Sequence, residues 1–414
     1  MFRNVLIPIA LFLAPFLSFG QSKDLNYFIE KSLQNNPKIP ELQNLILQNK
    51  LDSQLIVAGN KWQVAGNGNA YYAPIINGWG YDMAITNGQQ LSALVAVNKQ
   101  IYNNKNLSLR FNSLQLQNDS LFNSSAISKQ DIKKAIINQY ITTYGDQLQL
   151  DFNDKLIQLL TREEELLKQL TQKNVYKQAD YLTFLVTLQQ QQLARNELFV
   201  QYKNDYASLN YLAGIIDTTV ETLSEPELYV IQNYQPTESA FFLKYKIDSL
   251  RIENERSITR VQYRPKVNLF ADAGYQSTFI LNPYKNFGYN FGINLTIPIY
   301  DGHQKQLQFS KLDIQQMTLQ KQQDFFDHQY HQQLQQLHQQ LNDIGNLRYN
   351  IDKQIGYLET LIKVDGKLLE TGDIRITDYI LALNNYITAK NLVVQNQIAR
   401  YQVIQQINYW NMKL

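Results

Sequence analysis

Residues 289–300 read YNFGINLTIPIY, and their alternation of large apolar with small polar side chains decides how the rest of the chain is interpreted. A degenerate form of this stretch, QLSALVAVNKQIY, occupies residues 90–102. The two stretches end 198 positions apart, and the same offset carries Asp180 onto Asp378. The chain therefore contains two copies of a unit of roughly 200 residues, far longer than the repeats of solenoid proteins.

The alternation is clearest in the second copy. Even positions from 288 to 298 hold small or polar residues or proline, and odd positions hold Tyr289, Phe291, Ile293, Leu295, Ile297 and Ile299. Such a pattern is typical of a transmembrane strand with one face on lipid, so we predict that these six side chains face lipid. A half-buried sheet on a soluble core gives the same alternation, and the pattern alone leaves both open. We predict strands at 61–73, 90–102, 265–281 and 287–300.

Long helices are predicted where proline is absent, in residues 75–225 and 299–414. Proline inside a helix costs about 3 kcal/mol, so these tracts permit unusually long helices. We predict one helical hairpin over 104–213 and another over 303–412. An interrupted heptad indicates that the second hairpin is wound as a coiled coil. Its seam is predicted to contain Ile344, Leu347, Ile351, Leu358 and Leu361.

The predicted elements divide the chain into four parts. A signal peptide covers 1–20, the first copy 21–213, a linker 214–240 and the second copy 241–414. Each copy contains an initial helix, two strands and a hairpin.

The first residues have the pattern of an export signal. Arg3 precedes a nearly continuous apolar run from Val5 to Leu17, and small residues follow before Gln21. A transmembrane anchor is the alternative, but about 13 apolar residues are too few to cross a bilayer. After Gln21 no run of about 18 apolar residues occurs, so a membrane-inserted part would have to be built from strands.

Composition excludes several classes of function. The 414-residue chain has a formal net charge of only +2, without a basic stripe, which argues against a nucleic-acid partner. It contains no cysteine, which excludes disulfides and thiolate metal sites. No hydrolase, kinase, P-loop or dinucleotide-binding motif is found, so we expect neither enzymatic activity nor a cofactor. An exported enzyme is a further alternative that lacks any supporting site.

Three short stretches resemble the outer-membrane efflux protein family typified by TolC. Residues 295–302, LTIPIYDG, are similar to that family's strand ending in Pro-aromatic-Asp-Gly before a long helix. Residues 264–267, RPKV, resemble the start of the preceding strand, and residues 371–374, TGDI, resemble the turn between the paired helices. The resemblance covers essentially all of the chain after the signal peptide. The first copy departs from it, with Gln100 in place of the strand proline and Asn174 in place of the turn glycine.

This resemblance implies a mainly α-helical, TolC-like fold with a small transmembrane β part. Three chains would each contribute four strands to a twelve-stranded β-barrel, continued by an α-helical barrel in the periplasm. The implied function is the outer-membrane exit duct of a tripartite efflux or type I secretion system in a Gram-negative bacterium. The implied partners are two further copies, a periplasmic adaptor protein and an inner-membrane transporter. A soluble periplasmic coiled-coil structural or adaptor protein is the alternative.

The resemblance also implies functional positions. In the family, acidic residues ring the constriction at the inner end of the tunnel, and Asp180 and Asp378 lie at the matching places. Three chains would thus form a ring of six carboxylates, although helix capping explains the two residues equally well. The family's adaptor-contact turns correspond to Asn174, Val175, Tyr176, Lys177, Gly372, Asp373, Ile374 and Arg375. Inert surface turns would have the same composition.

Two clusters of polar residues do not require a catalytic or metal-binding role. We interpret residues 163–165, EEE, as a solvated helix face. His328, His331 and His338 fall within about one-third of a helix circumference, which suggests a path for metal ions. A polar face among glutamines is favoured, because His338 lies about two turns from His331 and no sulfur ligand exists. We therefore predict no metal site.

Overall fold

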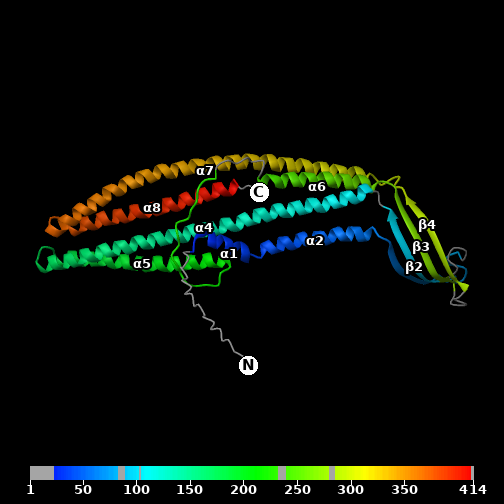
Figure 1. Ribbon diagram of the computed structural model, residues 1–414, viewed down its shortest axis with the longest axis horizontal. Helices are drawn as coiled ribbons and strands as arrows, with labels where there is room; N and C mark the ends of the chain where they lie inside the picture. Colours follow the sequence, from blue (N-terminus) through cyan, green and yellow to red (C-terminus); the bar gives the residue numbers. More distant parts are fainter. Residues whose placement is uncertain (1–22, 83–88, 102–103, 232–238, 279–284, 412–414) are drawn as a thin grey trace, which may run out of the picture. The chain divides into compact units, whose positions relative to one another are not determined.

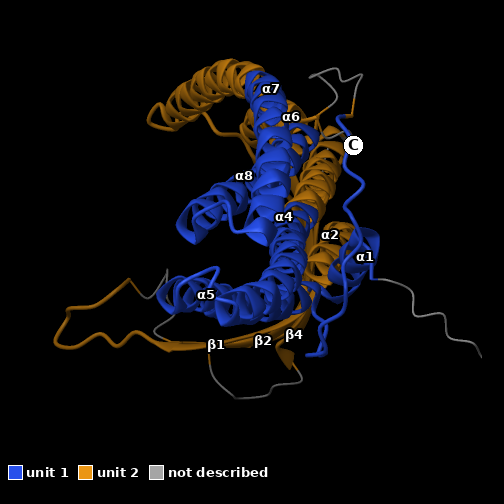
Figure 2. Cartoon of the chain, turned by 90° about the vertical axis from the view of Figure 1, so that its left-hand side faces the viewer, with its two compact units in different colours: residues 1–36, 132–230, 337–408 blue, residues 37–131, 231–336, 409–414 orange. Residues whose placement is uncertain are grey.

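The computed structural model describes residues 23–82, 89–101, 104–231, 239–278 and 285–411, so the predicted signal peptide lies outside it. The chain divides into two compact units, shown in Figure 2. The first, which we call the turn unit, comprises residues 1–36, 132–230 and 337–408. The second, the sheet unit, comprises residues 37–131, 231–336 and 409–414. Each unit draws on both copies of the repeat.

A four-stranded antiparallel sheet forms one part of the sheet unit (Figure 1). Its strands pair in sequence order: β1 (Gln63–Tyr72), β2 (Gln89–Ile101), β3 (Lys266–Ser277) and β4 (Phe287–Thr296). The two copies meet where β2 pairs with β3, from Leu91 opposite Ser277 to Ile101 opposite Val267. Strands β1 and β4 are therefore the edges, and among the described residues each pairs along one side only.

Strand β4 is shorter than predicted. Its last pair is Thr296 with Lys266, so Ile297 and Ile299 lie beyond the strand and not within it. The reason is the proline between them: Pro298 has no backbone N–H to donate to a ladder, and Pro265 likewise precedes the first residue of β3.

Helices complete the sheet unit. These are α2 (Lys38–Gly59), α6 (Ala240–Gln262) and the first parts of α4 (Asn104–Gln172) and α7 (Gln304–Thr371). The side chain of Ser239 caps α6 by accepting a hydrogen bond from the backbone N–H of Phe241 at 3.2 Å. Phe241 then packs against Phe326 and Trp410, with ring centroids 6.3 and 5.3 Å away.

The turn unit holds α1 (Leu25–Asn35), α5 (Gln178–Ala213), α8 (Ile376–Trp410) as far as Asn408, and the remaining parts of α4 and α7. Helix α4 packs on α5 and on α8. Its Gly145 lies so close to α8 that an added Cβ would be 2.2 Å from Cδ1 of Ile398. Helix α7 packs on the other side of α8. No helix of the described residues combines the length and apolarity needed to cross a membrane.

The α7–α8 seam differs in part from the predicted heptad. Ile351 and Leu358 are buried in it, together with Ile355 and Ala389. Leu347 and Leu361 are instead 53% and 44% exposed. Ile351 and Leu358, seven residues apart, both stay in the seam, but the second seam position is Ile355, four residues after Ile351. The prediction placed Leu347 and Leu361 by a three-residue step, so these two leucines lie beside the seam.

Candidate functional site at the helix turns

The two turns that join the paired long helices have the same backbone conformation. Asn174 and Gly372, equivalent positions in the two copies, have φ angles of 61° and 82°. Val175 donates its N–H to the carbonyl of Leu170 at 2.9 Å, and Asp373 makes the equivalent bond to Leu368, also at 2.9 Å. Both turns are therefore Schellman-type helix ends. Asparagine tolerates positive φ better than most residues, so the first copy keeps the turn without the family's glycine.

The two turns lie against one another. The hydroxyl of Tyr176 donates to the carbonyl oxygens of Leu369 and Ile374, at 3.2 and 3.1 Å. An added Cβ at Gly372 would lie 2.5 Å from Cγ1 of Val175, so the close approach requires glycine. Four of the predicted turn residues are thus in contact across the two copies: Val175, Tyr176, Gly372 and Ile374.

An apolar cluster supports these turns from α4, α5, α7 and α8. At its centre the rings of Phe184 and Tyr379 stack with centroids 6.5 Å apart, and both side chains are fully buried. The other buried members are Leu156, Leu160, Leu167, Tyr176, Leu188, Leu369, Ile376 and Leu383. The cluster makes both turns part of one packed end of the turn unit.

Asp180 and Asp378 occupy the first turns of α5 and α8, as predicted, but their surroundings differ. Arg375 donates two hydrogen bonds to the carboxylate of Asp378, at 2.9 and 3.1 Å. Asp180 has no ion-pair partner among the residues that the structure describes. Both carboxylates are half-buried, which leaves Asp180 the less compensated charge of the two.

Further carboxyl groups lie near the turns, and the sequence alone gave them no functional role. Glu163 is half-buried, and burial followed by the nearby Glu370 raises its pKa. Its neighbour Glu164 accepts a hydrogen bond from the hydroxyl of Tyr181. Glu163 and Glu164 are thus partly covered, whereas Glu165 is exposed, so the face formed by residues 163–165 is only partly solvated. Burial and the charge of Asp378 also raise the pKa of Asp365.

The three histidines remain on the polar face of α7. His328, His331 and His338 are all exposed, and His331 approaches Asp327 one helical turn away, with Nε2 and Oδ1 3.6 Å apart. Within the described part of the chain, no group of three or more metal-ligating side chains gathers.

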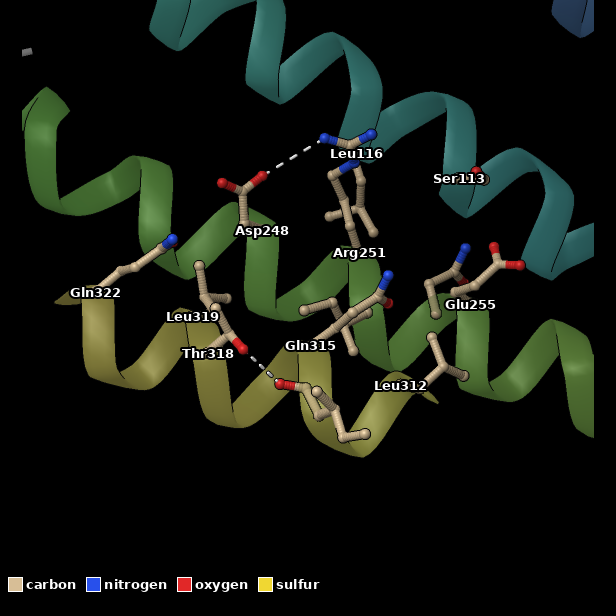
Figure 3. Close-up of a pocket in the computed structure, with 13 residues that line it drawn as sticks. Ser113, Leu116, Asp248, Arg251, Glu255, Leu312, Gln315, Thr318, Leu319 and Gln322 are labelled. Carbon is tan, nitrogen blue, oxygen red and sulfur yellow. Dashed lines mark hydrogen bonds and ion pairs between the residues drawn. The ribbon is translucent and has the colours of Figure 1, made fainter. Parts of the chain in front are cut away.

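A groove of about 500 Å³ lies between α4, α6 and α7 in the sheet unit (Figure 3). Asp248 and Arg251 point toward one another on α6, with an ion-pair distance of 3.5 Å. Asn254, also at the groove, donates to the carbonyl of Leu109 and accepts from Asn112. The residues that line the groove include neither histidine nor cysteine. The polar groups named here bond to one another or to backbone, as expected of a gap between packed helices.

The strand register places the apolar residues of both copies on one face of the sheet. Directly paired residues share a face, and Tyr289, Phe291 and Ile293 stand opposite Ala273, Ala271 and Leu269. The same face continues through Val95 and Val97 of β2 to Gly66 and Val64 of β1. It is largely uncovered: its exposed apolar residues include Val64, Val95, Tyr289, Phe291, Ile293 and Leu295.

The opposite face carries most of the polar side chains of the sheet. It carries Asn268, Asp272 and Asn290, and the amide of Asn290 donates to the carboxylate of Asp272 at 2.9 Å. Phe270 also lies on this face, where it breaks the alternation of the β3 sequence. Its ring lies over Gly292, where an added Cβ would be 2.7 Å from the ring, so glycine makes room for it.

No family model and no curated protein matches the chain. Solved structures do. A membrane protein from Pseudomonas aeruginosa matches with a TM-score of 0.75 and 12% identity over 94% of this chain and 93% of that one. The outer membrane protein VceC from Vibrio cholerae matches with a TM-score of 0.74 and 12% identity over 94% of this chain and 96% of its own.

A third match is the open state of the outer membrane channel MtrE from Neisseria gonorrhoeae, with a TM-score of 0.72 and 10% identity. That alignment covers 93% of this chain and 88% of MtrE. At such low identity the likeness concerns the fold. The mainly helical, TolC-like fold predicted from the sequence is confirmed, with its small antiparallel sheet.

Proposed function

We propose that this chain is the outer-membrane channel of a tripartite efflux or type I secretion system. In this proposal it performs no bond chemistry and provides a passive exit from the periplasm. An inner-membrane transporter supplies the energy and acts through a periplasmic adaptor protein. The observation that carries the proposal is the sheet: one face is apolar and exposed, the other carries most of the polar side chains, and within the described residues each edge strand pairs along one side only.

A sheet of this kind is completed by further copies of itself. Backbone N–H and C=O groups left unpaired in lipid cost several kcal/mol each, so open edges are not tolerated there. Joining β4 of one copy to β1 of the next satisfies both edges, and three copies would give twelve strands. The apolar face of the sheet would then meet lipid, and its polar face, with Asp272 and Asn290, would line the water-filled interior.

The helices of the turn unit offer a second surface for the same assembly. Helices α5 and α7 each have exposed apolar residues in the turn unit. On α5 they are Leu182, Val186, Leu193 and Val200, and on α7 they are Leu347, Leu361, Val364 and Leu368. In a head-to-tail ring, the exposed apolar residues of α5 in one copy would pack on those of α7 in the next.

In this assembly the paired turns form the inner end of the duct. Asp180 and Asp378 would form the charged constriction, and the exposed turn residues Lys177 and Arg375 would be available to an adaptor protein. The mechanism that we propose is mechanical: the duct opens when the hairpins move apart at the turns. The contacts of Tyr176 and of Gly372 with Val175 would hold them together in the closed state.

The proposal is tested by reconstitution. The chain is expressed with its predicted signal peptide in a Gram-negative host, extracted from the outer membrane with detergent and inserted into planar lipid bilayers. We expect recovery in the membrane fraction, a detergent-solubilised particle with the mass of three chains, and discrete steps of ionic conductance.

Two results would contradict it. Recovery of the mature chain as a stable water-soluble monomer would favour the periplasmic coiled-coil alternative. A membrane-extracted trimer without conductance, even after the Tyr176 contact is removed, would show that the assembly is not a duct.

A further inference from the structure

The connection between β1 and β2 contains a small, well-formed hairpin. Ile76 and Trp79 exchange backbone hydrogen bonds, with N–O distances of 2.9 and 3.0 Å. Asn77 and Gly78, between them, have φ angles of 52° and 82°. Positive φ at both central residues identifies a type I′ turn, and Asn-Gly is the sequence that this turn prefers. The end of the connection therefore has a defined shape.

The base of this hairpin is closed as tightly as its tip. An added Cβ at Gly80 would be 2.8 Å from the carbonyl oxygen of Pro74 and 3.0 Å from Cγ1 of Ile75. The two arms are thus in contact where the hairpin begins, and glycine is required there. A hairpin closed at both ends presents its side chains in a fixed arrangement.

Those side chains are apolar and face outward. Trp79 is 85% exposed, Tyr81 74% and Ile76 64%. Residues 72–82 read YAPIINGWGYD, in which Asp82 is the single charged residue. A connection on the surface of a protein is normally polar, because exposed apolar surface in water is unfavourable. Ile76 and Trp79 are directly paired, so their side chains lie on the same face of the hairpin and form one apolar surface.

This surface follows directly from the apolar face of the sheet. Tyr72, the last residue of β1, stands opposite Gln89 and lies on the same face as Val64 and Ala70, since alternate residues of a strand share a face. Its side chain is 73% exposed. The apolar face thus ends in tyrosine, and the hairpin with Ile76 and Trp79 comes next. Trp and Tyr are the residues that concentrate where a membrane meets water.

We propose that residues 75–81 form a membrane-interface anchor. Ile76 and Trp79 insert among the lipid headgroups and upper acyl chains beside the sheet, and Tyr81 stays at the level of the headgroups. The absence of Lys and Arg from residues 72–82 means that the contact is apolar and interfacial, and does not depend on attraction to anionic lipid. This inference rests on the proposed function, because it needs the apolar sheet face to lie in lipid.

The chain contains no cysteine, so a single introduced cysteine can be spin-labelled without altering any native one. Trp79→Cys is labelled and the full-length protein is reconstituted in phosphatidylethanolamine–phosphatidylglycerol vesicles. Collisions of the label with oxygen, which concentrates in the bilayer, are compared with collisions with a water-soluble nickel chelate. Phe291→Cys, on the apolar face of the sheet, and Ser208→Cys, exposed on α5, are the matched references.

We expect labels at positions 79 and 291 to collide preferentially with oxygen, and the label at 208 to collide preferentially with the chelate. A chelate preference at 79 together with an oxygen preference at 291 would overturn the anchor and leave the channel proposal intact. Protection of position 79 from both reagents would also overturn it, because the hairpin would then lie against protein. A chelate preference at 291 would remove the channel proposal and the anchor together. Ile76→Cys gives the same readout if Trp79→Cys does not assemble.

Discussion

The hydroxyl of Tyr176 donates a hydrogen bond to the carbonyl oxygen of Ile374, a residue 198 positions further along the chain, at 3.1 Å. That separation equals the offset between the two copies, so a turn residue of the first copy is bonded to its own counterpart in the second. The bond has no reciprocal form, because Ile374 has no side-chain donor. The duplication has therefore diverged into a donor turn and an acceptor turn.

Replacing Tyr176 with phenylalanine tests whether this bond holds the turns together. The substitution removes the hydroxyl that serves Leu369 and Ile374 and leaves the buried ring in place, so we expect a loss of about 1 kcal/mol from the turn contact. In planar bilayers the variant should spend more time in open states and show higher mean conductance than the wild type. Tyr211→Phe, at a side chain 83% exposed on α5, is the matched control and should behave as wild type. Equal conductance in all three proteins would show that the bond does not restrain the duct.

Gly372→Ala should loosen the same contact for a different reason. Its φ of 82° is unfavourable for alanine by about 1–2 kcal/mol, and the new methyl group would lie 2.5 Å from Val175. We expect trypsin to cleave faster at Lys177 and Arg375, which flank the turns. Gly356→Ala, within α7 and without a neighbouring atom within 4 Å, is the control and should be cleaved as wild type.

A second substitution separates the two causes. Val175→Ala in the Gly372→Ala background removes the methyl carbon that clashes but leaves the backbone strain, so it should restore only part of the resistance to trypsin. Full restoration of the resistance to trypsin would show that backbone strain is negligible. If no resistance were restored, the clash with Val175 would be negligible.

The fold was largely predictable because its main signals repeat along the chain. Period-two alternation over 289–299 gave a strand with the apolar face that the register confirms, and the proline-free tracts gave the long helices. The ends of the strands and the details of helix packing were less predictable. Strand β4 stops at Thr296 because Pro298 cannot donate to the ladder. Leu347 lies beside the α7–α8 seam because the second seam position is reached by a four-residue step, as at Ile355, and not by three residues.

The candidate site was predictable by position but not by contact. The repeat offset located Asp180 and Asp378, and both lie at helix starts as expected. Asp378 forms an ion pair with Arg375, three residues before it. The equivalent position in the first copy holds Lys177, which forms no such pair with Asp180 among the described residues. The bond from Tyr176 to Ile374 joins residues of two distant turns, and no local pattern encodes it. A hydrogen bond between residues this far apart in the sequence depends on how the helices pack.

Asp180→Ala should reduce the cation preference of the duct more than Asp378→Ala. Both remove one carboxylate per chain, but the charge of Asp378 is already compensated in part by Arg375 at 2.9 Å. The measurement is the reversal potential in a salt gradient, with Asp119→Ala, an exposed aspartate on α4, as the control. If neither constriction variant shifts the reversal potential, the carboxylates do not form the selectivity ring, and their role is confined to the helix starts.

Leu193→Glu should impair assembly without unfolding the subunit. Leu193 is 60% exposed in the single chain, so the charge is tolerated there, but it would be buried without a partner in the proposed α5–α7 interface. We expect a shift from trimer toward monomer, measured as particle mass in detergent. Gln192→Glu, the neighbouring exposed residue on another side of α5, should stay trimeric. A trimeric Leu193→Glu variant would place the interface elsewhere.

Because Asp146 is buried, we expect the stability of the folded protein to depend on pH. It is 4% exposed on α4, where Gln201 donates to it at 3.1 Å, and it stands beside the carboxylate of Asp205 on α5. Burial first, and then Asp205, raise the pKa of Asp146 from its ordinary 3.8 to about 7. The folded state thus keeps a proton that the unfolded state releases between these values. The stability that Asp146 contributes is complete below about pH 3.8 and is lost as the pH rises through about 7.

Asp146→Asn mimics the protonated carboxyl and should remove this dependence. Near pH 4 its unfolding temperature should equal that of the wild type, and at pH 8 it should be higher, by an amount corresponding to about 1–3 kcal/mol per chain. Thermal unfolding of the detergent-solubilised protein, followed by circular dichroism, measures both values. Asp119→Asn, at an exposed position, should keep the pH profile of the wild type. An unfolding temperature for Asp146→Asn that lies below the wild type at pH 8 would mean that Asp146 functions as a carboxylate in the folded protein, held by a partner that becomes available only in the assembled trimer.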